Sequence, residues 1–156
     1  RSLSMQRKYL GEALAMPAVA TDVDADLKAA VDGLPATYRG FMDDLHFHRA
    51  LEAVMEVVRR GNVYVDEVTP WELNKAGDTE RLATVLANLV EVVRVAAVLL
   101  SPVMPEACAR MFEQMGYGAD DLRLERDAVW GARPETLTIV KPKPVFQKIQ
   151  PQEEEG

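Results

Sequence analysis

Cysteine is nearly absent from this chain of 156 residues, because Cys108 carries its one thiol. An internal disulfide is therefore excluded, and this composition is typical of a reducing compartment, so we expect the cytoplasm. Nine glycines and nine prolines are too few for a collagen-like or disordered chain. The longest apolar run, residues 95–100, is far too short to span a bilayer. With 48% hydrophobic residues, the length suffices for one soluble globular domain with its own core.

Positive charge is also scarce, since 18 Lys and Arg stand against 25 Asp and Glu and leave a net charge of -7. Non-specific binding to nucleic acid depends on the neutralisation of phosphates, so this balance disfavours it. A chain of this kind would meet RNA only through a local basic patch. The candidates are Arg1, Arg7, Lys8, Arg59 and Arg60. The alternative for each of them is an ordinary solvated charge.

Patterns for catalysis and metal binding are missing as well. The sequence has no glycine-rich phosphate loop, no cysteine cluster with zinc spacing and no plausible Ser-His-Asp or Cys-His pairing. Asp22, Asp24 and Asp26 are spaced like the front of a calcium loop. That loop would need Gly and Glu where this chain has Leu27 and Gly33. We expect the three carboxylates to cap a helix start instead, and we assign no catalytic, cofactor or metal site.

Apolar residues recur at helical spacing along most of the chain. They predict an all-α fold, a bundle of about five helices. The predicted helices cover residues 1–14, 26–44, 45–68, 79–100 and 105–115. Apolar residues surround most of the fourth helix, so we expect it to be central and buried, with Asn88 as a satisfied polar residue of the core. Gly33 and Pro35 are expected to kink or split the second helix.

The stretch from Asn62 to Lys75 is the part around which we expect the chain to be organised. Pro70 prevents the preceding helix from continuing easily and pushes Thr69 out of the α region. A large ring, Trp71, is thereby held at a rigid helix end beside amide and basic groups. Such a Trp either folds over the core or serves as a stacking platform for a flat ligand, most commonly a nucleobase.

The residues of this stretch resemble a known family. Asn62-x-Tyr64, followed by Pro70-Trp71-x-Leu73 and Lys75, is similar to the anticodon-binding helical bundle of bacterial-type methionyl-tRNA synthetases. Three further segments match in order: Arg1-Ser2-Leu3-Ser4-Met5 with Lys8-Tyr9, Leu100-Ser101-Pro102-Val103-Met104-Pro105, and Pro142-Lys143-Pro144-Val145-Phe146-Gln147-Lys148-Ile149. In the last of these, Gln147 replaces the proline that is usual in the family.

The resemblance implies a site for the CAU anticodon of methionine tRNA. Trp71 would stack on an anticodon base, and Pro70 would fix the backbone that carries the ring. Arg1 matches the family arginine that contacts the first anticodon base. Asn62 is the next candidate, through its amide, and the alternative is a bond across helices that holds the Trp in place. Contacts to the RNA backbone are assigned to Arg59, Arg60 and Lys75.

The resemblance also implies that the chain belongs to a larger enzyme, methionine–tRNA ligase, a class I aminoacyl-tRNA synthetase. The class I nucleotide signatures, of the His-Ile-Gly-His and Lys-Met-Ser-Lys-Ser types, are absent here. ATP and methionine would bind the enzyme's own catalytic domain, with zinc in members that carry a zinc-binding insertion. That domain would be a partner of this chain, alongside methionine tRNA.

We expect residues 1–149 to form the bundle and an extended Pro-rich tail that folds back, with 1–14 as a truncated first helix. Residues 150–156 are acidic and expected to be disordered. The alternative function is a helical protein-interaction module without RNA binding. It predicts an exposed apolar patch and no dependence on RNA sequence.

Overall fold

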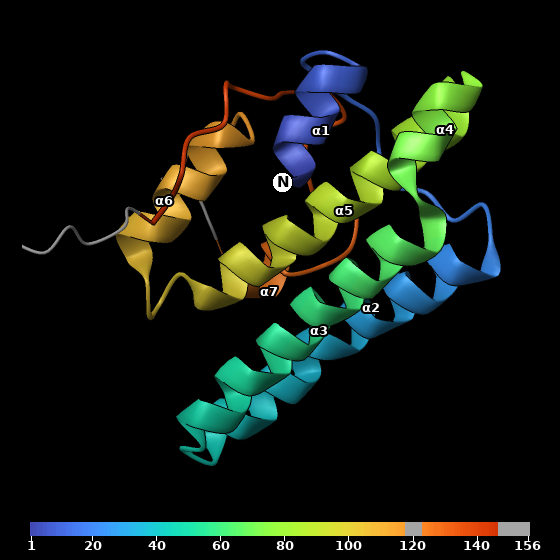
Figure 1. Ribbon diagram of the computed structural model, residues 1–156. Coiled ribbons are helices and arrows are strands. Elements are labelled where there is room, and N and C mark those ends of the chain that lie inside the picture. The colour runs from blue at the N-terminus through green and yellow to red at the C-terminus, as the bar shows by residue number, and fades with distance from the viewer. Residues whose placement is uncertain (118–122, 147–156) are drawn as a thin grey trace, which may run out of the picture.

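The computed structural model describes residues 1–117 and 123–146. These residues form a helical bundle with one small two-stranded sheet, so the predicted all-α class is confirmed. The elements are, in order, α1 Ser2–Tyr9, β1 Ala13–Leu14, α2 Asp22–Asp43, α3 Phe47–Val68, α4 Pro70–Ala76, α5 Thr79–Leu100, α6 Pro105–Gln114, α7 Leu124–Asp127 and β2 Leu137–Thr138. Figure 1 shows α2 and α3 as a long hairpin whose turn lies far from α1 and α4.

α5 is the central helix, and α1, α2, α3, α4, α6 and α7 all contact it. Its length and composition alone would allow it to span a membrane, but 83% of its most apolar window is buried inside the protein. It is therefore the core helix that the sequence predicts. Asp78 caps its start by accepting a hydrogen bond from the N–H of Arg81 at 3.1 Å. Asn88 is satisfied, as expected, because its amide bonds to both backbone groups of Ala18 at 3.0 and 2.8 Å.

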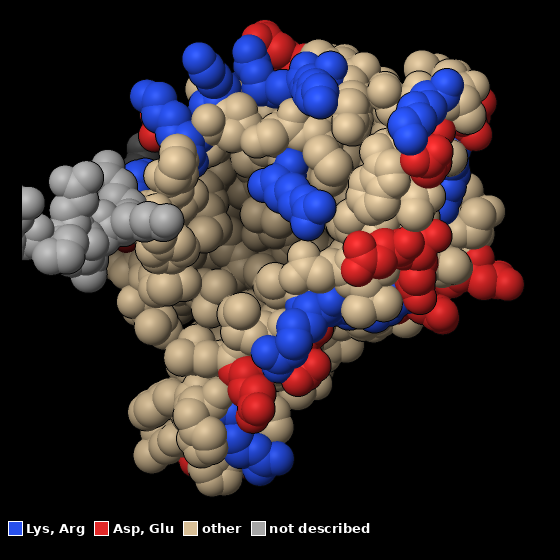
Figure 2. All heavy atoms as spheres, in the orientation of Figure 1, with Lys and Arg blue, Asp and Glu red and all other residues tan. Residues whose placement is uncertain are grey.

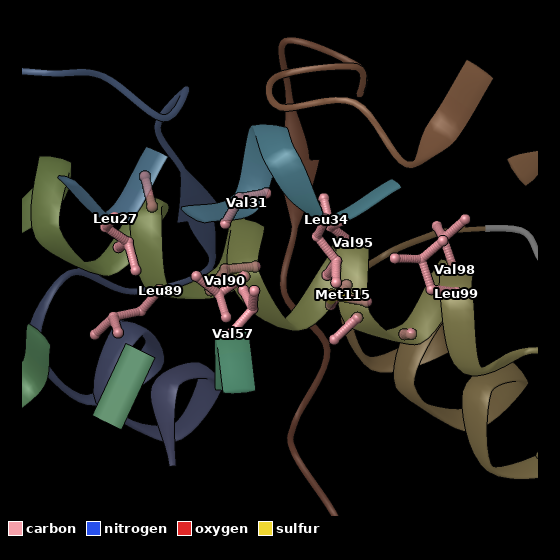
Figure 3. Packing of buried hydrophobic residues seen from close by; sticks show 14 of the residues in the cluster. Leu27, Val31, Leu34, Val57, Leu89, Val90, Val95, Val98, Leu99 and Met115 are labelled. Atoms are coloured by element: carbon pink, nitrogen blue, oxygen red, sulfur yellow. The ribbon is translucent and has the colours of Figure 1, made fainter. Parts of the chain in front are cut away.

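The core forms where α2 and α3 lie against α5. Figure 3 shows Leu27, Val31 and Leu34 of α2 and Val57 of α3 directed towards the side chains of α5. The α5 residues labelled there are Leu89, Val90, Val95, Val98 and Leu99. Burial of a Leu or Val side chain of this kind contributes roughly 1.5–3 kcal/mol to stability. This packing fixes the positions of the helix ends at which the candidate site lies.

α2 begins earlier than predicted because its first turn is capped. The Thr21 side chain accepts from the N–H of Asp24 at 3.4 Å, and the Asp24 carboxylate accepts from the N–H of Thr21 at 3.0 Å. This reciprocal pair is a capping box, so the capping role expected for the acidic triplet is confirmed at Asp24. The helix is not split at Pro35. Leu34 and Tyr38, which flank that proline, are buried in the core and stabilise the continuous helix.

The first helix is shorter than predicted and ends at Tyr9 instead of Leu14. Gly11 adopts a left-handed conformation, with φ of 83°, and turns the chain. Residues 13 and 14 then form β1, which pairs antiparallel with β2. The Gln6 amide supports this turn by donating to the carbonyl of Ala13 at 2.8 Å. The extended pairing therefore satisfies backbone groups that a longer helix would have satisfied internally.

Beyond β2 the described chain runs to Phe146 without a further helix or strand. Its backbone is tied to the rest of the fold, because the N–H of Ile139 donates to the carbonyl of Glu12 at 2.8 Å and that of Val140 donates to the carbonyl of Gln114 at 3.0 Å. The N–H of Lys143 donates to the side-chain oxygen of Gln114 at 2.8 Å. The Pro-rich fold-back tail stays a prediction. Its last three motif residues, 147–149, and the acidic end, 150–156, lie outside the described residues.

Candidate nucleic-acid interface

The corner between α3 and α4 is formed by Thr69 and Pro70. The N–H of Thr69 donates to the carbonyl of Val65 at 3.0 Å and closes α3. Thr69 then adopts φ 43° and ψ 67°, a left-handed conformation that costs a β-branched residue about 1–3 kcal/mol. Pro70 is buried as the first residue of α4, where its missing N–H is not needed. The prediction that Pro70 drives Thr69 out of the α region is confirmed, and the chain starts a new helix there.

Trp71 follows directly on this corner. Its indole is half-buried and packs against the hydrophobic core. Part of the ring therefore rests on the core and the rest stays accessible, while its role as a stacking platform stays a prediction. A ring anchored in this way presents its free surface in a fixed direction, as a stacking platform requires.

Asn62 is exposed on α3, just over two turns before Trp71. Among the described residues, no hydrogen bond joins its amide to another helix. The structure therefore gives no support to the alternative in which Asn62 bonds across helices to hold the Trp. The donor and acceptor of its side chain face the surroundings and are available to a ligand.

Each of the three cations proposed near the corner pairs with a carboxylate of its own helix. Arg59 binds Glu56, Arg60 lies 2.8 Å from Glu67, and Lys75 lies 2.7 Å from Glu72. Hydrogen bonding to Arg59 lowers the pKa of Glu56, so that pair stays ionised near neutral pH. Exposed pairs of this type are weak, so a phosphate can replace the carboxylate. These three cations therefore leave no excess of positive charge at the corner.

Arg1 lies at the start of α1 and is exposed. It lines a cavity of about 430 Å³ together with Val93 of α5, Met111 and Gln114 of α6, and residues 142–145. Figure 2 shows this face of the molecule hollowed beside the N-terminus that Figure 1 marks. Within the described chain no acidic group pairs with Arg1, so its guanidinium is available to a ligand.

The basic residues that follow Arg1 have other contacts. Arg7 donates to the carbonyl of Ile139 at 2.7 Å and pairs with Glu12 at 2.8 Å. It therefore ties α1 to the segment after β2. Lys8 lies over the ring of Tyr9, with 5.4 Å between Nζ and the ring centroid. Figure 2 shows Lys and Arg side chains gathered over the α1 end of the molecule, whereas Asp and Glu gather near the end of α3.

The structure thus distributes the predicted residues over three helices, α1, α3 and α4, which all pack on α5. Trp71, Pro70 and Asn62 lie at the α3–α4 corner, and Arg1 lies at the start of α1. Figure 1 shows α1 and α4 at the end of the bundle opposite the α2–α3 turn. In the described part of the chain, no hydrogen bond, ion pair or cation–π contact joins Arg1 to Trp71.

Beneath the corner lies a buried polar network that the sequence pattern did not reveal. Asp24 of α2 accepts a hydrogen bond from the Tyr64 hydroxyl of α3 at 2.5 Å. It also accepts two from the guanidinium of Arg81 on α5, at 2.6 and 2.9 Å. Burial raises the pKa of Asp24, but the hydrogen bonds from Arg81 and Tyr64 outweigh it and hold that pKa well below the ordinary value. Burial and the bond to Asp24 raise the pKa of Tyr64.

A second missed network holds the C-terminal segment on α5. Glu91 and Arg94 are paired and buried, and Glu91 also accepts from the N–H of Gly131 at 2.6 Å. Arg94 donates to the carbonyl of Val129 at 2.6 Å. Burial lowers the pKa of Arg133, whose Nε lies 3.6 Å from Glu91. The signal available in the sequence was two opposite charges one turn apart in the most apolar helix.

This arrangement suits binding, because it combines an aromatic platform with free amide and guanidinium donors. Among residues 1–117 and 123–146, no group of three His, Cys, Asp or Glu side chains could hold a metal ion. The single thiol, Cys108, is buried, and burial raises its pKa, which makes it a poor nucleophile.

Known proteins share this sequence and fold. The family model described as the anticodon binding domain of methionyl tRNA ligase matches residues 16–156. A methionine–tRNA ligase of Mycobacterium leprae is 38% identical over all of this chain, which covers 29% of that protein. One of Thermosynechococcus vestitus is 31% identical over 96% of the chain and 30% of its own length.

Solved structures agree with these matches. The Mycobacterium tuberculosis methionyl-tRNA synthetase bound by methionyl-adenylate superimposes with a TM-score of 0.85 and 34% identity, over 94% of this chain and 29% of that one. This chain therefore spans less than a third of the length of these relatives. The match over most of its residues shows that the chain belongs to the family of anticodon-binding domains of methionyl-tRNA ligases.

Proposed function

We propose that this chain recognises the CAU anticodon of methionine tRNA, as the tRNA-binding part of a methionine–tRNA ligase. The observation that carries the proposal is the placement of Trp71 in a domain of this family. Its ring is half-buried on a corner where Thr69 and Pro70 restrict the backbone. Sequence-specific readers of RNA loops stack unpaired bases on such rings and bond to the exposed base edges.

Trp71 supplies the stacking surface in this mechanism. A base stacked on an aromatic side chain contributes roughly 1–3 kcal/mol. The ring needs no large rearrangement before it binds, because core packing on one side and the proline-locked corner on the other already restrict it. Less conformational entropy is lost on binding as a result.

Arg1 and Asn62 supply the polar contacts. The guanidinium of Arg1 offers a planar fork of donors to the edge of the first anticodon base. The Asn62 amide offers a donor and an acceptor, which suits the edge of a second base. Both side chains are exposed. They would approach the loop from α1 and α3, the two sides of the bundle end that carries Trp71.

Arg59, Arg60 and Lys75 are proposed to contact the RNA backbone. Each would exchange a carboxylate partner for a phosphate, so its net contribution to affinity is small. The chain as a whole carries a charge of -7, so binding must depend on this local patch and on the bases.

In the whole enzyme, anticodon contact would orient the acceptor end of the tRNA towards a catalytic domain outside this chain. That domain would bind ATP and methionine and carry out the ligation, while this chain holds no cofactor itself. We place the enzyme in the cytoplasm, with methionine tRNA and its own catalytic domain as partners. Residues 1–149 would form the RNA-reading bundle and its tail.

The test is binding of the chain to a CAU anticodon stem-loop at low salt. The fluorescence anisotropy of the labelled RNA reports the binding. Two controls are needed: the same stem-loop with its anticodon scrambled, and a Trp71→Ala chain. The proposal expects affinity to fall in both. Equal affinity for the two RNAs, unaffected by Trp71→Ala, would overturn it.

The alternative, a protein-interaction module, draws on one observation. The turn between α2 and α3 exposes Leu45 and Phe47, whose exposed fractions are 72% and 52%. Apolar residues this exposed are candidates for contact with another protein. A chain without sequence-dependent RNA binding, whose partner affinity is lost in Phe47→Ala, would favour this function.

A further inference from the structure

Two residues that flank α4 in the chain converge on one buried carboxylate. Tyr64 precedes α4 on α3, and Arg81 follows it on α5. Both donate to Asp24 of α2, the hydroxyl at 2.5 Å and the guanidinium at 2.6 and 2.9 Å. The segment between them, which carries Trp71, is thus a loop closed at its base by Asp24. We call Asp24, Tyr64 and Arg81 the clamp.

We propose that Asp24 is a positioning residue for Trp71: through Tyr64 and Arg81 it holds the ends of α3 and α5 at the separation that presents the indole to RNA. This inference rests on the proposed function and adds to it the residues that set the platform's orientation. The three clamp residues lie on α2, α3 and α5.

The short helix α4 depends on its ends for its orientation. It has seven residues, too few to be stable by itself. Both of its junctions are left-handed, at Thr69 with φ 43° and at Gly77 with φ 74°. Such junctions are sharp, so a small movement of α3 against α5 turns α4 and the ring attached to it. A clamp that fixes this separation therefore also fixes the ring.

Direct contact with RNA is excluded for the clamp's central groups. Asp24 and Tyr64 are each 0% exposed, and Asn88 from α5 donates to the Tyr64 hydroxyl at 3.3 Å on its other side. Any effect of Asp24 or Tyr64 on RNA binding must consequently pass through the position of other residues. Two charge-assisted bonds to Arg81 make the clamp stiff, because such bonds are short and directional.

The variants that test the clamp are Tyr64→Phe and Asp24→Asn. Tyr64→Phe removes one hydroxyl and leaves the capping box and the Arg81 pair in place, so it opens the α3 side alone. Leu34→Ala is the matched control. It destabilises α2, the helix that carries Asp24, through a cavity about 15 Å further along that helix. All are made with Trp130→Phe, so that Trp71 is the one fluorescent indole.

The first measurement needs no RNA: the acrylamide quenching of Trp71 fluorescence in each folded chain. We expect quenching and emission wavelength to change in Tyr64→Phe and Asp24→Asn and to stay the same in Leu34→Ala. The second measurement is the affinity for the CAU stem-loop, expected to fall about fivefold in the clamp variants and not in the control.

The outcomes separate this inference from the proposed function. If the parent chain does not distinguish CAU from a scrambled anticodon, the proposed function fails, and the quenching experiment alone decides the clamp. If quenching in Tyr64→Phe and Asp24→Asn equals that of the parent, Asp24 serves stability alone and the inference is overturned. The inference is equally overturned if Leu34→Ala shifts quenching and affinity as much as Tyr64→Phe and Asp24→Asn do.

Discussion

Glu91 and Arg94 lie one turn apart on α5 and are paired inside the core, with 2.6 Å between Arg94 Nη2 and Glu91 Oε1 and 3.0 Å between Nε and Oε2. Both side chains are almost fully buried. The same carboxylate accepts from the N–H of Gly131, and the same guanidinium donates to the carbonyl of Val129. This one pair therefore fastens the segment after α7 to the central helix.

Glu91→Ala is expected to lower the free energy of unfolding by about 3–5 kcal/mol, because it leaves the buried charge of Arg94 without its partner. Urea denaturation followed by circular dichroism measures this loss. Glu80→Ala is the control, as an exposed acid in the first turn of the same helix, and should change stability by no more than about 0.5 kcal/mol. Similar losses of unfolding free energy in the two variants would show that the buried Glu91–Arg94 pair does not contribute to stability.

Gly116→Ala is expected to destabilise the fold by about 1–3 kcal/mol. Gly116 has φ 83°, and a Cβ built there would lie 2.5 Å from the carbonyl oxygen of Thr138, so β2 would have to move. Gly33→Ala offers the opposite case, since nothing lies within 4 Å of a Cβ there and α2 would gain about 0.5–1 kcal/mol. Thermal melting of the two glycine variants checks both expectations. An undiminished melting temperature in Gly116→Ala would contradict the close approach of β2 to Gly116.

The stability of the chain should depend on Asp24 between about pH 5 and the acid limit. Its pKa is lowered in the folded state, so the unfolded chain binds a proton first as the pH falls. The stabilisation is thus fully present above the ordinary carboxyl pKa and is lost as the pH falls towards the folded value. Urea midpoints of the parent and of Asp24→Asn should therefore differ most near neutral pH and converge in acid. A gap that stays constant with pH would contradict the ionised clamp.

Arg60→Ala should weaken binding to the stem-loop modestly and lower the salt dependence, by about 0.7 in the slope of log affinity against log salt. The physical reason is the loss of one phosphate contact. Arg39→Ala is the control, because this exposed arginine lies on α2 towards the turn that points away from α4. An unchanged slope in Arg60→Ala would remove Arg60 from the proposed backbone contacts.

Much of the fold follows from local pattern. The periodicity of residues 79–100 predicts α5 with its bounds and its burial, because a helix surrounded by apolar side chains must lie inside. Pro70 likewise marks the corner, since a proline restricts the residue before it whatever the context. The left-handed form of Thr69 was beyond this reasoning, because it depends on where α4 packs. The end of α1 was missed for a similar reason, as β1 gains its hydrogen bonds from a strand more than a hundred residues away.

The sequence by itself determined the helical class, the corner that carries Trp71 and the resemblance that identifies the family, since all three are written in short stretches of neighbouring residues. Only the tertiary structure decided that Asp24 joins Tyr64 and Arg81, which lie 40 and 57 residues away along the chain. It also decided which cations are paired and which are free. A side chain's partner depends on which helices lie side by side, and that follows from the packing of the whole core, which no single helical pattern contains.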